Sequence, residues 1–135
     1  MKVIPFTMEH GQTLDITIPL NRLYDYTQGP SYTLIAEDKV VCAFGVMVMW
    51  EKVGVAWGML GPDFRKYKLF VTRNAKRMLG DVQRALSLDR IEVQCLPNEM
   101  YKRWLCALGF EREYGIARKY INGQNVVRFE MIKGD

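Results

Sequence analysis

Few side chains in this sequence are of the types that most often carry out chemistry. The one histidine, His10, has no carboxylate or cysteine at a catalytic spacing, so we expect a surface residue rather than a catalyst. The three cysteines, Cys42, Cys95 and Cys106, lie far apart, and an odd number without close pairs argues against a disulfide framework and against a zinc site. We therefore expect no bound metal and a reducing environment.

Basic side chains gather at two places that could bind an anion. Arg65, Lys66 and Lys68 stand where a long helix is predicted to start, and they could hold a phosphate; a solvated helix start is the alternative. Four more basic residues share the polar side of that helix and could contact nucleic acid, although no aromatic stacking platform lies beside them. These four are Arg73, Lys76, Arg77 and Arg84. The net charge of +4 permits an anionic partner without requiring one.

The best-defined element that could position a site is a short helix after Pro97. Asn98 is a good N-cap, and Gly109 can take the left-handed conformation that ends a helix, so Phe110 begins the next strand. One apolar face follows from the helical spacing of its large side chains. These are Tyr101, Trp104, Leu105 and Leu108. We expect Trp104 and Phe110 to be core residues.

This segment, an Asn followed eleven residues later by Gly-Phe between two strands, resembles the last conserved segment of the GNAT acyltransferase family. It is more similar to a phage branch of that fold, which resembles the internal virion protein of short-tailed phages. That branch has Trp-x-Leu-Gly-x-Asp, a basic helix, a strand, and then Asn…Arg-Trp-Leu-x-x-Leu-Gly-Phe. The matching residues, within about residues 32–132, are Trp57, Leu60, Gly61, Asp63, Asn98, Arg103, Trp104, Leu105, Leu108, Gly109 and Phe110.

The resemblance implies a single α/β domain over residues 1–135, with a mixed, mostly antiparallel sheet, a central long helix and a C-terminal β-hairpin. The apolar patterns agree with it. They predict strands at Lys2–Phe6, Tyr32–Ala36, Val40–Trp50, Val55–Leu60, Ile91–Leu96, Tyr114–Ile121 and Val126–Ile132, with the last two joined at Asn122-Gly123, and helices at Leu20–Tyr26 and Tyr67–Leu86. The rest of residues 7–29 has no readable pattern.

Two of these strands are expected to form a cleft. A strand, a long helix and another strand make a crossover, so Ile91–Leu96 should pair in parallel with Val55–Leu60. The resemblance, together with Pro97, predicts that the two strands then diverge into a V.

In the GNAT family, the pyrophosphate of acetyl-CoA binds a glycine-rich loop at the start of the long helix, where backbone N–H groups can approach it. The glycine positions fall here on Lys68 and Phe70, so that cradle is absent in its usual form. The resemblance implies that acetyl-CoA, if the protein uses it, would contact Leu60, Arg65, Lys66, Lys68 and Asn98.

The catalytic groups that the resemblance implies are also incomplete. The family's general acid, a Tyr on the last helix, falls on Leu105, which has no proton to give. Tyr101, one turn earlier, is a candidate acid, with simple packing as the alternative. The strand that should carry the general base has no carboxylate, which leaves Glu51 and Asp63 at its two ends; each is more often a turn residue.

Two classes of function follow. The loss of three parts of the usual machinery favours a phage GNAT-like protein with a degenerate acetyltransferase site, which binds other virion or host proteins in the host cytoplasm during infection or inside the virion. The alternative is an acetyl-CoA-dependent N-acetyltransferase that acts on a protein or a small amine. No apolar run of membrane-spanning length appears without a charge, and Met1–His10 does not have the pattern of a secretory signal.

Overall fold

The computed structural model describes residues 1–95, 97–113, 117–121 and 124–133. The strands form a mixed sheet in the order β1-β2-β3-β4-β5-β8-β6, and β7 pairs with β8. The strands are β1 (Lys2–Pro5), β2 (Ser31–Ala36), β3 (Lys39–Trp50), β4 (Val53–Leu60), β5 (Arg90–Cys95), β6 (Glu111–Arg112), β7 (Ala117–Ile121) and β8 (Gln124–Ile132). The helices are α1 (Met8–Leu14), α2 (Leu20–Thr27), α3 (Lys68–Ala85) and α4 (Glu99–Ala107), with a 3₁₀ turn, η1 (Phe64–Tyr67), before α3. None of the described helices is long and apolar enough to cross a membrane.

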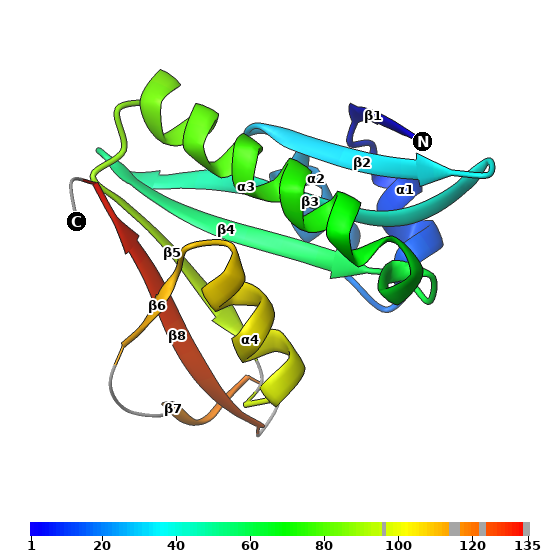
Figure 1. The fold of residues 1–135 in the computed structure, drawn as a ribbon. Helices are drawn as coiled ribbons and strands as arrows, with labels where there is room; N and C mark the ends of the chain where they lie inside the picture. Colours follow the sequence, from blue (N-terminus) through cyan, green and yellow to red (C-terminus); the bar gives the residue numbers. More distant parts are fainter. Residues whose placement is uncertain (96, 114–116, 122–123, 134–135) are drawn as a thin grey trace.

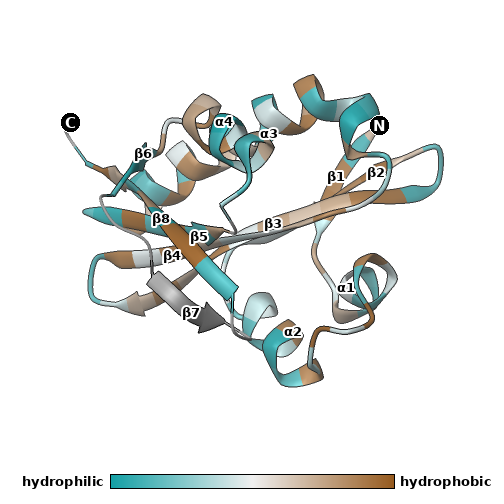
Figure 2. Ribbon diagram, turned by 90° about the horizontal axis from the view of Figure 1, so that it is seen from below, coloured by the Kyte–Doolittle hydropathy of each residue, from teal (hydrophilic) through white to brown (hydrophobic). Residues whose placement is uncertain are grey.

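Helices cover both faces of the sheet, as the apolar strands predict. The α3 and α4 helices lie on one face, and α1 and α2 lie on the other (Figures 1 and 2). This arrangement explains why β3 is buried without interruption from Val41 to Val46, since alternate side chains of a strand point to opposite faces. Two apolar clusters result, a large one under α3 and α4 and a smaller one around Trp57 under α1 and α2.

The long helix begins one residue later than predicted, after the 3₁₀ turn. Its buried side chains repeat at helical spacing, which turns one face onto the sheet. They are Val71, Ala75, Met78, Leu79 and Val82. Leu86, the last residue of the predicted helix, follows the last residue of α3 and is 42% exposed.

The N-terminal segment, which the sequence left open, forms α1 and α2. Thr7 caps α1 by accepting a hydrogen bond from the backbone N–H of His10, and His10 Nδ1 accepts one from the backbone N–H of Thr7 at 3.2 Å. The same nitrogen lies 2.9 Å from the hydroxyl of the fully buried Thr33, which must therefore donate to it. His10 is half-buried and structural, so the expectation of a surface residue is wrong. Within the described chain, its side-chain hydrogen-bond partners are Thr7 and Thr33, neither of which is a carboxylate or a cysteine.

The predicted cleft is present. The β4 and β5 strands pair in parallel only at Val53–Arg90, Gly54–Ile91 and Val55–Glu92, whereas β5 pairs with β8 along its whole length. Beyond Val55 the two strands separate, so the sheet opens like a V (Figure 1). The β4 strand stays paired with β3 as far as Leu60, so from Ala56 onward its other edge has no strand partner among the described residues.

The short helix after Pro97 is also confirmed. The Asn98 side-chain oxygen accepts hydrogen bonds from the N–H groups of Met100 at 2.8 Å and Tyr101 at 3.3 Å. Gly109 has a φ of 103°, the left-handed conformation that ends the helix. Trp104 and Phe110 are 8% and 3% exposed, so both are core residues.

The C-terminal hairpin is confirmed where the structure describes it, because β7 pairs antiparallel with β8. The predicted turn at Asn122-Gly123, the first residues of the predicted strand Tyr114–Ile121 and the last residue of Ile91–Leu96 lie outside the described residues.

Candidate functional site

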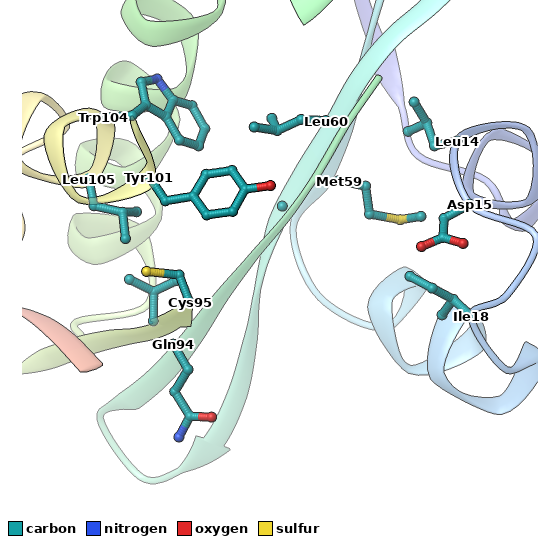
Figure 3. Close-up of a pocket in the computed structure, with 12 residues that line it drawn as sticks. Leu14, Asp15, Ile18, Met59, Leu60, Gln94, Cys95, Tyr101, Trp104 and Leu105 are labelled. Atoms are coloured by element: carbon teal, nitrogen blue, oxygen red, sulfur yellow. The ribbon is translucent and has the colours of Figure 1, made fainter. Parts of the chain in front are cut away.

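A cavity of about 350 Å³ opens where β4 and β5 separate (Figure 3). Its walls come from the ends of both strands, from α4 on one face of the sheet, and from the segment between α1 and α2 on the other. Because helices on opposite faces line one cavity, the opening passes through the sheet. A ligand could therefore enter from either face.

Tyr101 is the polar side chain that α4 directs into this cleft. Its ring projects from the helix and its hydroxyl points toward β4 (Figure 3). The helix is fixed behind it, because Trp104 packs edge-on against Phe64 with ring centroids 5.2 Å apart and its indole N–H bonds to Thr72 on α3 at 2.9 Å. The cleft therefore holds a proton donor on a rigid element.

The wall opposite α4 includes a free backbone edge of β4. From Ala56 to Leu60 the edge of β4 that faces β5 has no strand partner among the described residues. Gly58 leaves room there, since a side chain added to it would meet nothing closer than the Ala43 carbonyl oxygen at 3.9 Å. An extended ligand with amide groups could hydrogen-bond along this edge as a strand would.

Asp15 lies on the other face of the sheet, beside Met59 and Ile18 (Figure 3). Its carboxylate accepts hydrogen bonds from the hydroxyl of Thr17 at 2.6 Å and from the backbone N–H of Thr17 at 2.9 Å. Both bonds stabilise the charged form of Asp15 and hold its pKa below its ordinary value. The bond from the Thr17 hydroxyl contributes most to this shift. Asp15 is the one charged residue among the described residues that line the cavity.

The predicted phosphate-binding side chains stand at the start of α3, and all three are exposed. Arg65 reaches the sulfur of Met100 at 3.9 Å, which places it at the N-terminal end of α4 as well. Lys66 Nζ lies 3.6 Å from Glu37, and Lys68 forms no ion pair with another described residue. Three backbone N–H groups of this segment already have acceptors: Phe64, Lys66 and Lys68 donate to the carbonyl oxygens of the residues three positions earlier.

The other predicted site residues divide into two groups. Leu60 lines the cavity, as expected of a contact residue. Asn98 is exposed and its side-chain oxygen is occupied in capping α4. Asp63 follows β4 but does not line the cavity. Glu51 lies in the β3–β4 turn, next to the end of β4 that pairs with β5, so it is remote from the opening and the suggestion that it acts as a base in the cleft is wrong.

Solved structures identify the architecture. A GNAT-family acetyltransferase from Bacillus anthracis matches with 18% identity and a TM-score of 0.74, over 98% of this chain and 95% of that one. The chain has the GNAT fold. No family model matches the sequence, and the search of curated proteins returns no significant relative.

Two further structures with the GNAT fold agree. The Bacillus subtilis acetyltransferase in complex with CoA matches with 14% identity and a TM-score of 0.71, over 97% of each chain. The ribosomal-protein-S5-alanine acetyltransferase of Vibrio fischeri matches with 21% identity and a TM-score of 0.70, over 86% of this chain and 68% of that one. None of these matches bears on the phage branch, which stays a prediction.

The structure shows where the chain differs from the usual GNAT site at the two positions expected from the sequence. Phe70 packs partly buried against the core, and Lys68 is exposed in the first turn of α3, so no glycine exposes bare backbone there. Leu105 is buried and lines the cavity beside Tyr101. Asp15 is the residue that sequence reasoning missed. Its only signal is the Asp-x-Thr spacing of a local side-chain turn, which is common in loops without function.

Proposed function

We propose that the protein is an acyl-CoA-dependent N-acyltransferase, with acetyl-CoA as the donor. The observation that carries the proposal is the hydroxyl of Tyr101 inside a cleft that passes through the sheet and faces the free edge of β4. The acetyltransferases that share the fold support it. The fold alone would not, because one fold serves many functions.

The residues present fit the two chemically distinct parts of acyl-CoA. The pantetheine arm carries amide groups, which the unpartnered edge of β4 can hydrogen-bond from Ala56 to Leu60. The phosphates are anionic, and Arg65, Lys66 and Lys68 supply three cationic side chains at the start of α3. Because side chains replace the backbone N–H cradle, we expect weaker phosphate binding than a glycine-rich loop would give.

The chain's own groups can account for the proton transfers. As the neutral acceptor nitrogen attacks the acyl carbon and the carbon–sulfur bond breaks, the Tyr101 hydroxyl gives its proton to the departing thiolate and is later reprotonated from solvent. The proton lost by the acceptor nitrogen leaves to water, since β4 carries no carboxylate. Without a protein base we expect a rate that rises with pH as the neutral fraction of the amine grows.

A second candidate function is a non-catalytic binding protein, including the virion-associated role that the phage resemblance implies. It is favoured by one observation: the backbone N–H groups of Phe64, Lys66 and Lys68 already donate to carbonyl oxygens, so they are not free to bind the pyrophosphate. The same cleft and exposed basic side chains would then serve as a docking surface for another protein.

Ligand binding separates these two candidates. Purified protein is heated with and without CoA, and a ligand that binds only the native state raises the melting temperature. At a hundredfold excess over the dissociation constant the stabilisation is about 2.7 kcal/mol, which corresponds to several degrees for a domain of this size. Lys68→Ala should reduce the shift, whereas Lys76→Ala, an equal loss of charge on the exposed side of α3, should not. A melting temperature that does not respond to CoA would favour the binding protein.

A further inference from the structure

The cleft has unlike chemistry on the two faces of the sheet. Cationic side chains stand at the start of α3 on one face, and the Asp15 carboxylate lies on the other. Because Ile91 and Val93 pack in the core under α3 and α4, alternation along β5 turns Glu92 to the opposite face, but its charge is compensated by Arg90 at 2.9 Å. Asp15 takes part in none of the ion pairs formed among the described residues. The second face of the cleft therefore presents one uncompensated negative charge.

The geometry of Asp15 suits the holding of a cation. Both hydrogen bonds from Thr17 reach Oδ1, which fixes the carboxylate and leaves Oδ2 available to a ligand. The loop that carries Asp15 is short, and it ends at Pro19, directly before the first residue of α2.

The lining near Asp15 is apolar. Ile18 and the buried Met59 flank it, and Leu14 precedes it in the chain. An acceptor that passes Asp15 and reaches Tyr101 must therefore place an apolar segment against these side chains. Its reacting nitrogen must be neutral to attack the acyl carbon, so the positive charge that Asp15 attracts has to belong to another group of the same molecule.

These features together define a class of acceptor. We propose that the acceptor is a linear diamine whose non-reacting ammonium is held by Asp15, whose methylene chain lies on Ile18 and Met59, and whose neutral amine faces Tyr101. This inference rests on the proposed function, and it adds a specificity-determining residue on the α1–α2 segment.

The test compares two acceptors that have the same four-carbon chain and differ in the second amine. Acetyl transfer to α,ω-diaminobutane and to n-butylamine is measured as kcat/KM with acetyl-CoA saturating. We expect the diamine to be preferred about two- to fivefold, the scale of one exposed charge pair. Asp15→Asn keeps the oxygen that accepts from Thr17 and should abolish the preference, leaving n-butylamine unchanged. Asp25→Asn, the same change on the exposed surface of α2 outside the cavity, should preserve it.

Direct titration of α,ω-diaminobutane into the protein without CoA separates the two proposals. Binding that weakens in Asp15→Asn upholds the diamine site even if no acetyl transfer occurs, and only the acyltransferase proposal is then overturned. Acetyl transfer without a diamine preference, or with a preference that survives in Asp15→Asn, overturns the diamine site and leaves the acyltransferase intact.

Discussion

The indole N–H of Trp104 donates a hydrogen bond of 2.9 Å to the hydroxyl of Thr72, which in turn donates one of 2.7 Å to the carbonyl oxygen of Lys68. This chain ties α4 to the first turn of α3. Since Tyr101 lies one turn before Trp104 on α4, the bond also sets where the Tyr101 hydroxyl enters the cleft.

We expect Trp104→Ala to lower the free energy of unfolding by about 3–5 kcal/mol, because it removes a buried aromatic side chain. Thr72→Val should cost about 1–3 kcal/mol, since it leaves the buried indole N–H without an acceptor. Urea denaturation of both variants and of the double variant measures these losses and their coupling. A loss under about 1 kcal/mol for Trp104→Ala would mean that the indole is not part of the core.

Tyr101→Phe removes the proposed acid and keeps the ring. We expect kcat for acetyl transfer to fall by about 10²–10⁴-fold, which is the usual contribution of one proton-transfer partner. The CoA-induced thermal shift should stay unchanged. The matched control is Tyr24→Phe, which removes an equivalent hydroxyl from the exposed surface of α2. An unaltered kcat in Tyr101→Phe would exclude this residue as the acid.

The cysteines should differ in reactivity. Burial raises the pKa of Cys42 to about 12, so at pH 8 only about one thiol in 10⁴ is a thiolate, whereas Cys106 is exposed. Iodoacetamide on the folded protein should label Cys106 and leave Cys42 unmodified until denaturant is added. Peptide mass spectrometry reads both sites. Labelling of Cys42 in the native protein would show that β3 is more accessible than its burial indicates.

Arg90 should make the free energy of unfolding depend on pH in the acid range. It bonds to Glu92, Glu113 and Glu130, and its hydrogen bond to Glu113 is the main cause that lowers the pKa of that carboxyl. A depressed carboxyl pKa stabilises the fold above the unfolded value, about 4.3, and that stability is lost as the pH falls through the folded value. The free energy of unfolding should therefore drop as the pH is lowered from about 5 to 3.

The Arg90→Gln variant tests this assignment. The substitution leaves three carboxylates together without their cation, so we expect the free energy of unfolding to fall by about 3 kcal/mol at pH 7. The free energy of unfolding of the variant should also change less as the pH is lowered into the acid range. Arg84→Gln, which breaks an exposed pair with Asp81, should cost under about 1 kcal/mol. Equal losses in the two variants would contradict the assignment.

The sequence could predict those elements that local chemistry determines. Asn98 and Gly109 mark the two ends of α4 by capping and by a left-handed backbone, and the apolar repeats mark β3, β4 and α3. The V between β4 and β5 was also predicted, because Pro97 ends the strand and the resemblance supplied the topology.

What the sequence could not predict depends on contacts between distant segments. The hydrogen bond between His10 and Thr33 spans 23 residues, so no local pattern marks His10 as structural. Asp15 and Tyr101 line one cavity only after α1 and α4 pack on opposite faces of the sheet. Glu51 looked suitable because it is close to β4 in the chain, but it stands at the wrong end of that strand.

The most direct test of the central claim is acetyl transfer itself. Purified protein is incubated with acetyl-CoA and α,ω-diaminobutane. The release of free CoA thiol is followed over time, and the acetylated amine is quantified by mass spectrometry. We predict equal amounts of free CoA and acetylated amine, with both reduced at least a hundredfold in Tyr101→Phe. Folded protein that binds no CoA and forms no acetylated amine across the alkaline pH range would contradict the assignment as an acyltransferase.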